Sequence, residues 1–77
     1  MFDVSGITDM SELFYWSKFN GDISDWDVSN VKTMQSMFES SEFNGDISEW
    51  DTSNVYDMHY MFNGTPLEKN PPKWYKD

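Results

Sequence analysis

The sequence predicts an α/β repeat protein: a short right-handed solenoid of about three 24-residue coils, each with one short helix and one very short parallel strand. The segment FNGDISDWDVSNV at residues 19–31 returns as FNGDISEWDTSNV at residues 43–55, so equivalent positions such as Phe19 and Phe43 differ by 24. Apolar residues after each copy follow a helical spacing, and a turn-flanked segment inside each copy is typical of a short strand.

The period divides a single domain, 1–77, into a truncated first repeat at 2–25, a second repeat at 26–49, a third repeat at 50–65 and a C-terminal cap at 66–77. The first repeat begins at the position of Trp26, which Phe2 occupies. A solenoid normally covers its terminal apolar face with a capping unit. We therefore expect further repeats to precede this one in a parent protein.

One helix is expected in each unit, because four apolar positions fall within a narrow arc at about 100° per residue. In the second unit these positions are Val31, Met34, Met37 and Phe38, and the other units carry apolar residues at the same places. Ser5, Ser29 and Ser53 precede the three stripes as candidate N-caps.

A two- or three-residue strand is expected after the turn dipeptides Asn20-Gly21 and Asn44-Gly45, at residues 22–24 and 46–48. Ile23 and Ile47 would point inward from these strands. The residues expected to build the repeat are Phe19, Ile23, Trp26, Val31, Met34, Phe38, Phe43, Ile47, Trp50, Val55, Met58 and Phe62.

The last segment departs from the pattern. Trp74 takes the position of Trp50, but Pro71 and Pro72 interrupt the expected strand. Proline has no N–H to donate to a strand ladder, so we expect this segment to close the array with Trp74 folded over the last coil.

The bulk composition excludes several function classes. The net charge is −9, with five Lys and no Arg, which disfavours nucleic acid and anionic membrane surfaces. The chain has no Cys, no segment with the features of a signal peptide and no apolar run long enough for a transmembrane helix. Four Trp, six Phe and four Tyr supply the bulk of a small core.

Candidate partner contacts lie where the units differ. On the expected helices Trp16, Tyr56 and Tyr60 face away from the apolar arc, and exposed aromatic residues are enriched at protein interfaces. The alternative is that the cap or the incomplete first coil covers them. His59, the single histidine, occupies a variable surface position beside Tyr60. No catalytic set, metal site or cofactor site is predicted.

Stacked acidic residues form a second candidate feature. Asp3, Asp27 and Asp51 are equivalent, as are Asp22 and Asp46. Stacked carboxylates repel one another unless they are solvated, hydrogen-bonded or bridged by a cation such as calcium. The spacing matches no calcium motif, and the simpler interpretation is that these side chains bond nearby backbone amides.

The unit F-N-G-D-I-S-x-W-D-[VT]-S-N-V-x-x-M-x-x-M-F resembles the BspA-like repeat family of bacterial surface proteins and lipoproteins, over about residues 2–75. This resemblance implies a leucine-rich-repeat-like solenoid on the cell surface or secreted as part of a parent protein. It also implies adhesion, binding of a host or cell-surface protein, no enzymatic activity and no cofactor.

Three functions therefore remain open. The leading one is a non-enzymatic, adhesin-type interaction module at the C-terminal part of a longer array. The alternatives are a purely structural cap or spacer, and a calcium-dependent binding module. We also expect self-association through the open N-terminal coil.

Overall fold

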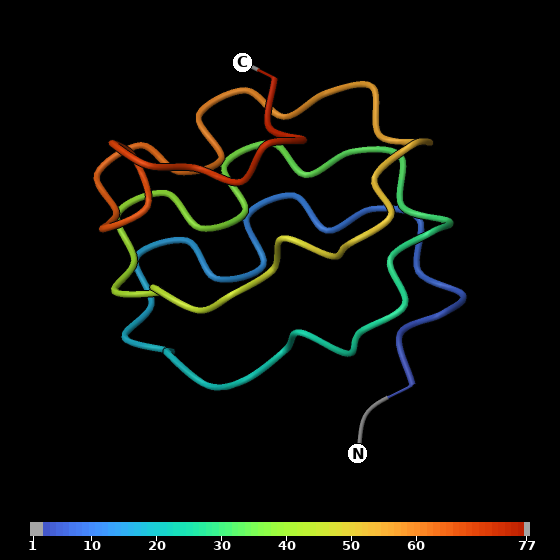
Figure 1. The fold of residues 1–77 in the computed structure, drawn as a ribbon, viewed down its shortest axis with the longest axis horizontal. Coiled ribbons are helices and arrows are strands. Elements are labelled where there is room, and N and C mark those ends of the chain that lie inside the picture. The colour runs from blue at the N-terminus through green and yellow to red at the C-terminus, as the bar shows by residue number, and fades with distance from the viewer. Residues whose placement is uncertain (1–2, 77) are drawn as a thin grey trace.

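The repeat units lie in successive tiers, with the first turn segment (blue), the second (green) and the third (orange) one above another (Figure 1). This computed structural model describes residues 3–76, so Phe2 lies outside the described residues. Isolated parallel bridges pair Asp9 with Thr33 and Thr33 with Asp57. These three residues are one period apart, and equivalent segments of consecutive units therefore lie side by side.

The expected helix-plus-strand solenoid is wrong. Between residues 3 and 76 the structure has no helix, and its only extended pairing is the two isolated bridges. Each segment expected to be a helix is instead a series of tight turns. In the second unit the N–H groups of Met37, Glu39 and Ser41 donate to carbonyls three residues earlier, at 3.1, 3.3 and 2.9 Å.

The intervening N–H groups cross to the next unit. Ser36, Phe38 and Ser40 donate to the carbonyls of His59, Met61 and Asn63, at 2.8, 3.0 and 2.8 Å. The first unit makes the same bonds to the second, as Phe14 does to Met37 at 2.8 Å. Alternate amides thus close turns within a unit and join neighbouring units.

Left-handed backbone explains why no helix forms. Six residues at two equivalent positions of the three units have positive φ angles: Glu12 (61°), Trp16 (61°), Ser36 (56°), Ser40 (59°), Tyr60 (62°) and Gly64 (75°). A right-handed α-helix needs φ near −63° at every residue. A left-handed residue at every fourth position therefore ends any helical turn, while the turns still place apolar side chains at a spacing of three and four.

The expected caps and strands are also replaced by local turns. Ser29 does not cap a helix: its N–H and its hydroxyl donate to Asp27 Oδ1, at 3.0 and 2.6 Å. Ser5 and Ser53 bond their neighbouring aspartates in the same way. Asp46 accepts the N–H of Ser48 at 3.0 Å, which turns the chain where a strand was expected.

The core runs through the stack and contains the residues expected to build the repeat. Val31, Met34, Met37 and Phe38 are completely buried. Nine of the twelve repeat residues named above are buried, and Phe19, Trp26 and Val55 are partly buried against them. The rings of Phe14, Phe38 and Phe62 form a continuous stack, with centroid separations of 5.5 and 5.8 Å.

Tryptophan side chains beside this phenylalanine stack join distant segments of the chain. Trp50 Nε1 donates to the Ile23 carbonyl at 3.1 Å, and Trp74 Nε1 donates to the Ile47 carbonyl at 2.9 Å. The two indoles stack with centroids 6.1 Å apart. Trp74 therefore repeats the role of Trp50 over the third unit.

Gly21 and Gly45, the glycines of the two repeated Asn-Gly dipeptides, make room for an aromatic ring. A Cβ added at Gly45 would lie 2.7 Å from Phe43 Cζ, and one added at Gly21 would lie 2.8 Å from Phe19 Cε1. Phe43 is buried and stacks on Phe38 with centroids 4.4 Å apart, whereas Phe19 is only partly buried. The ring at Gly45 therefore has less freedom to move.

We predict that Gly45→Ala lowers the free energy of unfolding by about 1–3 kcal/mol, because the added methyl group overpacks the core. Gly21→Ala should cost less. Gly6→Ala is the matched control, since its Cβ would meet no atom within 4 Å. Urea denaturation of the three variants measures the order, and equal stability at all three sites would contradict it.

Candidate interaction surface

Three of the four candidate contact residues are among the most exposed aromatic side chains in the structure. Trp16 is 70% exposed, Tyr56 78% and Tyr60 60%. Neither the cap nor the first unit covers them. They occur where the other units carry smaller or charged residues; the equivalents of Trp16, for example, are Ser40 and Gly64.

The backbone, and not a helix, presents these side chains. All three belong to the turn segments that join the units. Trp16 and Tyr60 occupy the two left-handed positions, with φ angles of 61° and 62°. The helix expected to carry Tyr56 and Tyr60 is therefore the wrong element, although both side chains are exposed.

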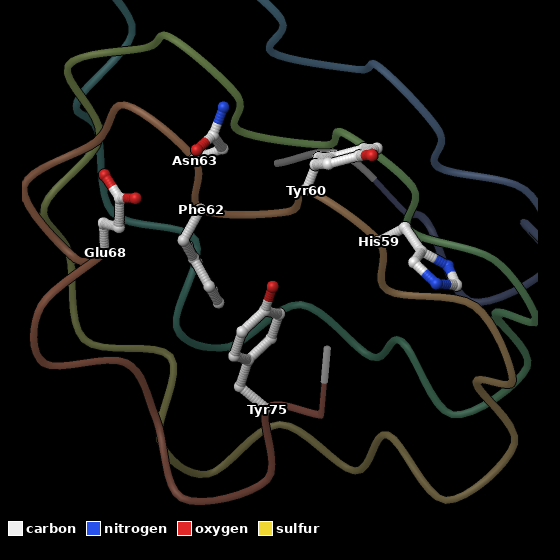
Figure 2. Close-up of a pocket in the computed structure, with 6 residues that line it drawn as sticks. All are labelled: His59, Tyr60, Phe62, Asn63, Glu68 and Tyr75. Carbon is white, nitrogen blue, oxygen red and sulfur yellow. The ribbon is translucent and has the colours of Figure 1, made fainter.

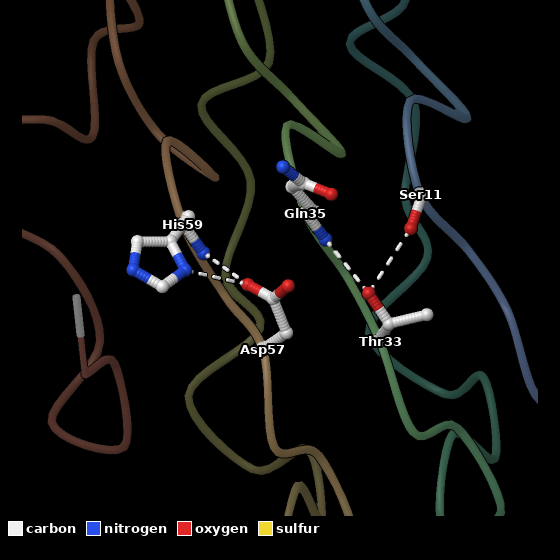
Figure 3. A network of polar contacts seen from close by, with 5 residues as sticks. All are labelled: Ser11, Thr33, Gln35, Asp57 and His59. Atoms are coloured by element: carbon white, nitrogen blue, oxygen red, sulfur yellow. Dashed lines mark hydrogen bonds and ion pairs between the residues drawn. The ribbon is translucent and has the colours of Figure 1, made fainter.

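His59 is held by its neighbour Asp57. Its N–H lies 3.1 Å from Asp57 Oδ1, and its Nδ1 lies 2.7 Å from the same atom (Figure 3). The N–H and then the ring of His59 lower the pKa of the Asp57 carboxyl group. This pairing fixes the imidazole at the surface, as expected for a variable position.

The same local turn recurs with different side chains in the other units. Gln35 donates its N–H to Thr33 Oγ1 at 3.4 Å, and Ser11 donates its N–H to Asp9 Oδ1 at 2.8 Å. The Ser11 hydroxyl also lies 3.1 Å from Thr33 Oγ1 and so connects two units (Figure 3). In each unit the N–H of the residue at this position donates to the side chain two residues earlier. The side chain of the donating residue itself differs from unit to unit.

A hollow of about 480 Å³ lies at the C-terminal end of the stack (Figure 2). It is lined by His59, Tyr60, Phe62, Asn63, Glu68 and Tyr75. The structure thus brings His59 and Tyr60 to one hollow, whereas Trp16 and Tyr56 do not line it. Sequence comparison of the units missed Glu68 and Tyr75, because both lie in the cap, where they replace the unlike residues Asn44 and Asp51 of the repeat pattern.

The stacked aspartates are hydrogen-bonded by serines. Donation from the hydroxyl and then the N–H of Ser29 lowers the pKa of Asp27, although the charges of Asp51 and Asp3 oppose this shift. Donation from the N–H and then the hydroxyl of Ser48 likewise lowers the pKa of Asp46. Within residues 3–76, no group of three or more acidic or histidine side chains is arranged to hold a metal ion.

We predict that acid destabilises the fold through these carboxylates. Their pKa values are lower in the folded chain than in the unfolded chain, where the pKa of an Asp side chain is about 3.9. Their stabilisation is therefore complete above the unfolded pKa and is lost as the pH falls through the folded pKa. Unfolding free energy, measured by urea at several pH values, should be nearly constant above about pH 5 and fall below about pH 4.

The variant Asp46→Asn separates this effect from general acid denaturation. The amide oxygen still accepts the Ser48 N–H but does not titrate, so the dependence on pH should become shallower. Asp25→Asn is the control, because no described residue donates to the Asp25 carboxylate. An equal change of slope in both variants would contradict the assignment.

The comparisons with known proteins give one family. The model of the family described as "Mycoplasma protein of unknown function, DUF285" matches residues 1–76. Neither the curated proteins nor the solved structures contain a match to the chain. Within residues 3–76, no helix is long and apolar enough to cross a membrane. Because the family model covers nearly the whole chain, the chain belongs to the DUF285 family of repeat proteins.

Proposed function

We propose that this chain is a non-enzymatic protein-interaction module of adhesin type, displayed on a bacterial surface as the C-terminal part of a longer repeat array. The repeat pattern, the membership of the DUF285 family and the resemblance to BspA-like surface repeats support this proposal. Its partner is a host or cell-surface protein.

The observation that carries the proposal is the placement of large aromatic side chains at exposed, non-repeating positions. Trp16, Tyr56 and Tyr60 contribute little to the core, since each is at least 60% exposed. Trp and Tyr provide large contact areas at low entropic cost, and they dominate the binding energy of many interfaces.

The backbone conformation strengthens the argument. A residue other than glycine with positive φ costs about 1–2 kcal/mol, and Asn or Asp tolerates the conformation better than a bulky side chain does. Gly64 and Trp16 occupy equivalent left-handed positions in the third and first units. The third unit therefore uses glycine at this position, whereas the first unit uses a bulky aromatic residue. An exposed side chain that opposes stability is more readily explained by binding than by folding.

We predict that Trp16→Gly is more stable than Trp16→Ala by about 1 kcal/mol, because only glycine adopts the left-handed conformation without a steric penalty. At an ordinary exposed position the order is reversed, since glycine has more conformational freedom to lose on folding. Paired urea denaturation curves measure the difference. A more stable alanine variant would remove the strain argument.

The binding function is tested with the triple variant Trp16→Ala, Tyr56→Ala and Tyr60→Ala. The immobilised wild-type chain should capture a protein from host-surface and matrix extracts. The folded triple variant should bind that protein with at least tenfold lower affinity, which corresponds to about 1.4 kcal/mol of binding free energy. Lys18→Ala, which shortens an exposed side chain outside this aromatic set, is the control.

The purely structural alternative makes the opposite prediction. If the segment is only a cap or spacer, the three substitutions change no binding, whether they are made in this chain or in a longer array that contains it. Capture retained by the triple variant would therefore favour the spacer over the interaction module.

A further inference from the structure

The two junctions between units have the same hydrogen-bonding pattern and polarity. At each junction, N–H groups of the earlier unit donate to carbonyls of the later one, as Phe14 does to Met37 and Phe38 does to Met61, at 2.8 and 3.0 Å. Other bonds run back toward the N-terminus: the N–H of Lys32 donates to the Thr8 carbonyl at 2.7 Å, and Trp50 Nε1 donates to the carbonyl of Ile23, 27 residues earlier, at 3.1 Å. The pattern therefore distinguishes the two ends of the stack.

The N-terminal end presents a row of acceptors. Asp9, Ser11, Leu13 and Tyr15 are equivalent to Thr33, Gln35, Met37 and Glu39, whose carbonyls each accept a bond from the preceding unit. The four N-terminal carbonyls accept no hydrogen bond from any described residue. Likewise Trp26 Nε1 has no described acceptor, although the equivalent atoms of Trp50 and Trp74 do.

Apolar side chains are uncovered at the same end. Leu13 is 48% exposed, whereas its equivalent Met37 is completely buried beneath the first unit. Together with Ile7, Phe14, Phe19 and Trp26, Leu13 lines a largely apolar hollow of about 600 Å³. We call this hollow and its row of four carbonyls the N-terminal edge.

The C-terminal end is partly closed. Its outward N–H groups are those of Met58, Tyr60, Phe62 and Gly64, but Gly64 donates to Glu68 Oε1 at 3.0 Å. The ring of Tyr75 packs edge-on against Phe62 with centroids 5.0 Å apart. The cap thus occupies the space into which a following unit would pack.

We propose that the N-terminal edge is a docking site for one further repeat unit of the same pattern, joined in the register of the two internal junctions. Such a unit supplies alternate N–H donors to the four carbonyls, a carbonyl to Trp26 Nε1, and apolar side chains to the hollow. The inference rests on that part of the proposed function which places the chain in a longer array.

A second copy of this chain fits the edge less well. Two copies joined edge to edge would oppose two rows of carbonyls, which cannot bond each other. A copy joined through its C-terminal end would have to displace Tyr75 and free Gly64 from Glu68. Two chains of net charge −9 also repel one another.

The test adds the unit in covalent form. A copy of residues 26–49 is placed directly before Phe2, which preserves the 24-residue period. Amide hydrogen exchange followed by NMR should show at least tenfold protection of the copied counterparts of Met34, Ser36, Phe38 and Ser40. Exchange of the Trp26 indole N–H should slow by a similar factor, toward that of Trp50.

Two controls test the polarity of the stack and the apolar contact at the N-terminal edge. A copy of residues 30–53 attached after Asp77, which keeps the 24-residue period at that end, should remain unprotected, because the cap occupies the space that a following unit would fill. Leu13→Glu should reduce the protection of the added unit severalfold, while it changes the stability of the 77-residue chain much less, since Leu13 is half exposed there.

Three results would overturn the proposal. The first is an added N-terminal unit whose amides exchange as fast as those of an unfolded chain. The second is loss, on addition of the unit, of the amide protection that residues 3–76 show in the 77-residue chain. The third is a concentration-dependent dimer of the 77-residue chain, seen by sedimentation and abolished by Leu13→Glu. None of these measurements involves a partner protein, so their failure is distinguishable from failure of binding through the aromatic residues.

Discussion

The alternation of backbone hydrogen bonds is the constraint on which the rest of this structure depends. In the turn segments, one amide closes a turn within its own unit and the next donates to the following unit, as Met37 and Phe38 do. Buried backbone groups must find partners, and this arrangement satisfies them without a helix or a regular sheet. It also requires the left-handed conformation at Ser36, Ser40 and their equivalents. The turns, the spacing of the core side chains and the polarity of the stack all follow from it.

The repeat period and the identity of the core residues could be predicted from the sequence, because buried positions recur every 24 residues. The equivalence of Trp74 and Trp50 was visible for the same reason, and both indoles make the same bond. The secondary structure could not be predicted in this way. Successive turns produce the same three- and four-residue spacing of apolar residues as a helix. Serine is also not a residue type that indicates a positive φ angle, so Ser36 and Ser40 gave no sign of the left-handed conformation. The steric requirement for glycine at position 45 could not be predicted either, because the contact between Gly45 and Phe43 depends on how the Phe43 ring lies over the backbone.

The same backbone directs the residues that recur in every unit and the residues that differ between units to different environments. Side chains that recur point into the core, close local turns as the serine–aspartate pairs do, or join distant segments as the tryptophans do. Positions that face outward from the turns accept residues as different as Ser11, Gln35 and His59 without altering the hydrogen bond of the amide. The exposed Trp16, Tyr56 and Tyr60 occupy such positions. Exposure of Tyr56 and Tyr60 was predicted from the wrong element, because a turn segment and an amphipathic helix both direct repeated apolar residues inward and variable ones outward.

The most direct test of this account is the measurement of scalar couplings across hydrogen bonds by NMR. The alternating pattern predicts a coupling between the amide nitrogen of Phe38 and the carbonyl carbon of Met61, and one between Met37 and Met34. A helical unit would instead couple Phe38 to Met34 and would give no coupling between Phe38 and Met61. Observation of the helical coupling would contradict the fold, the left-handed positions and the docking edge together.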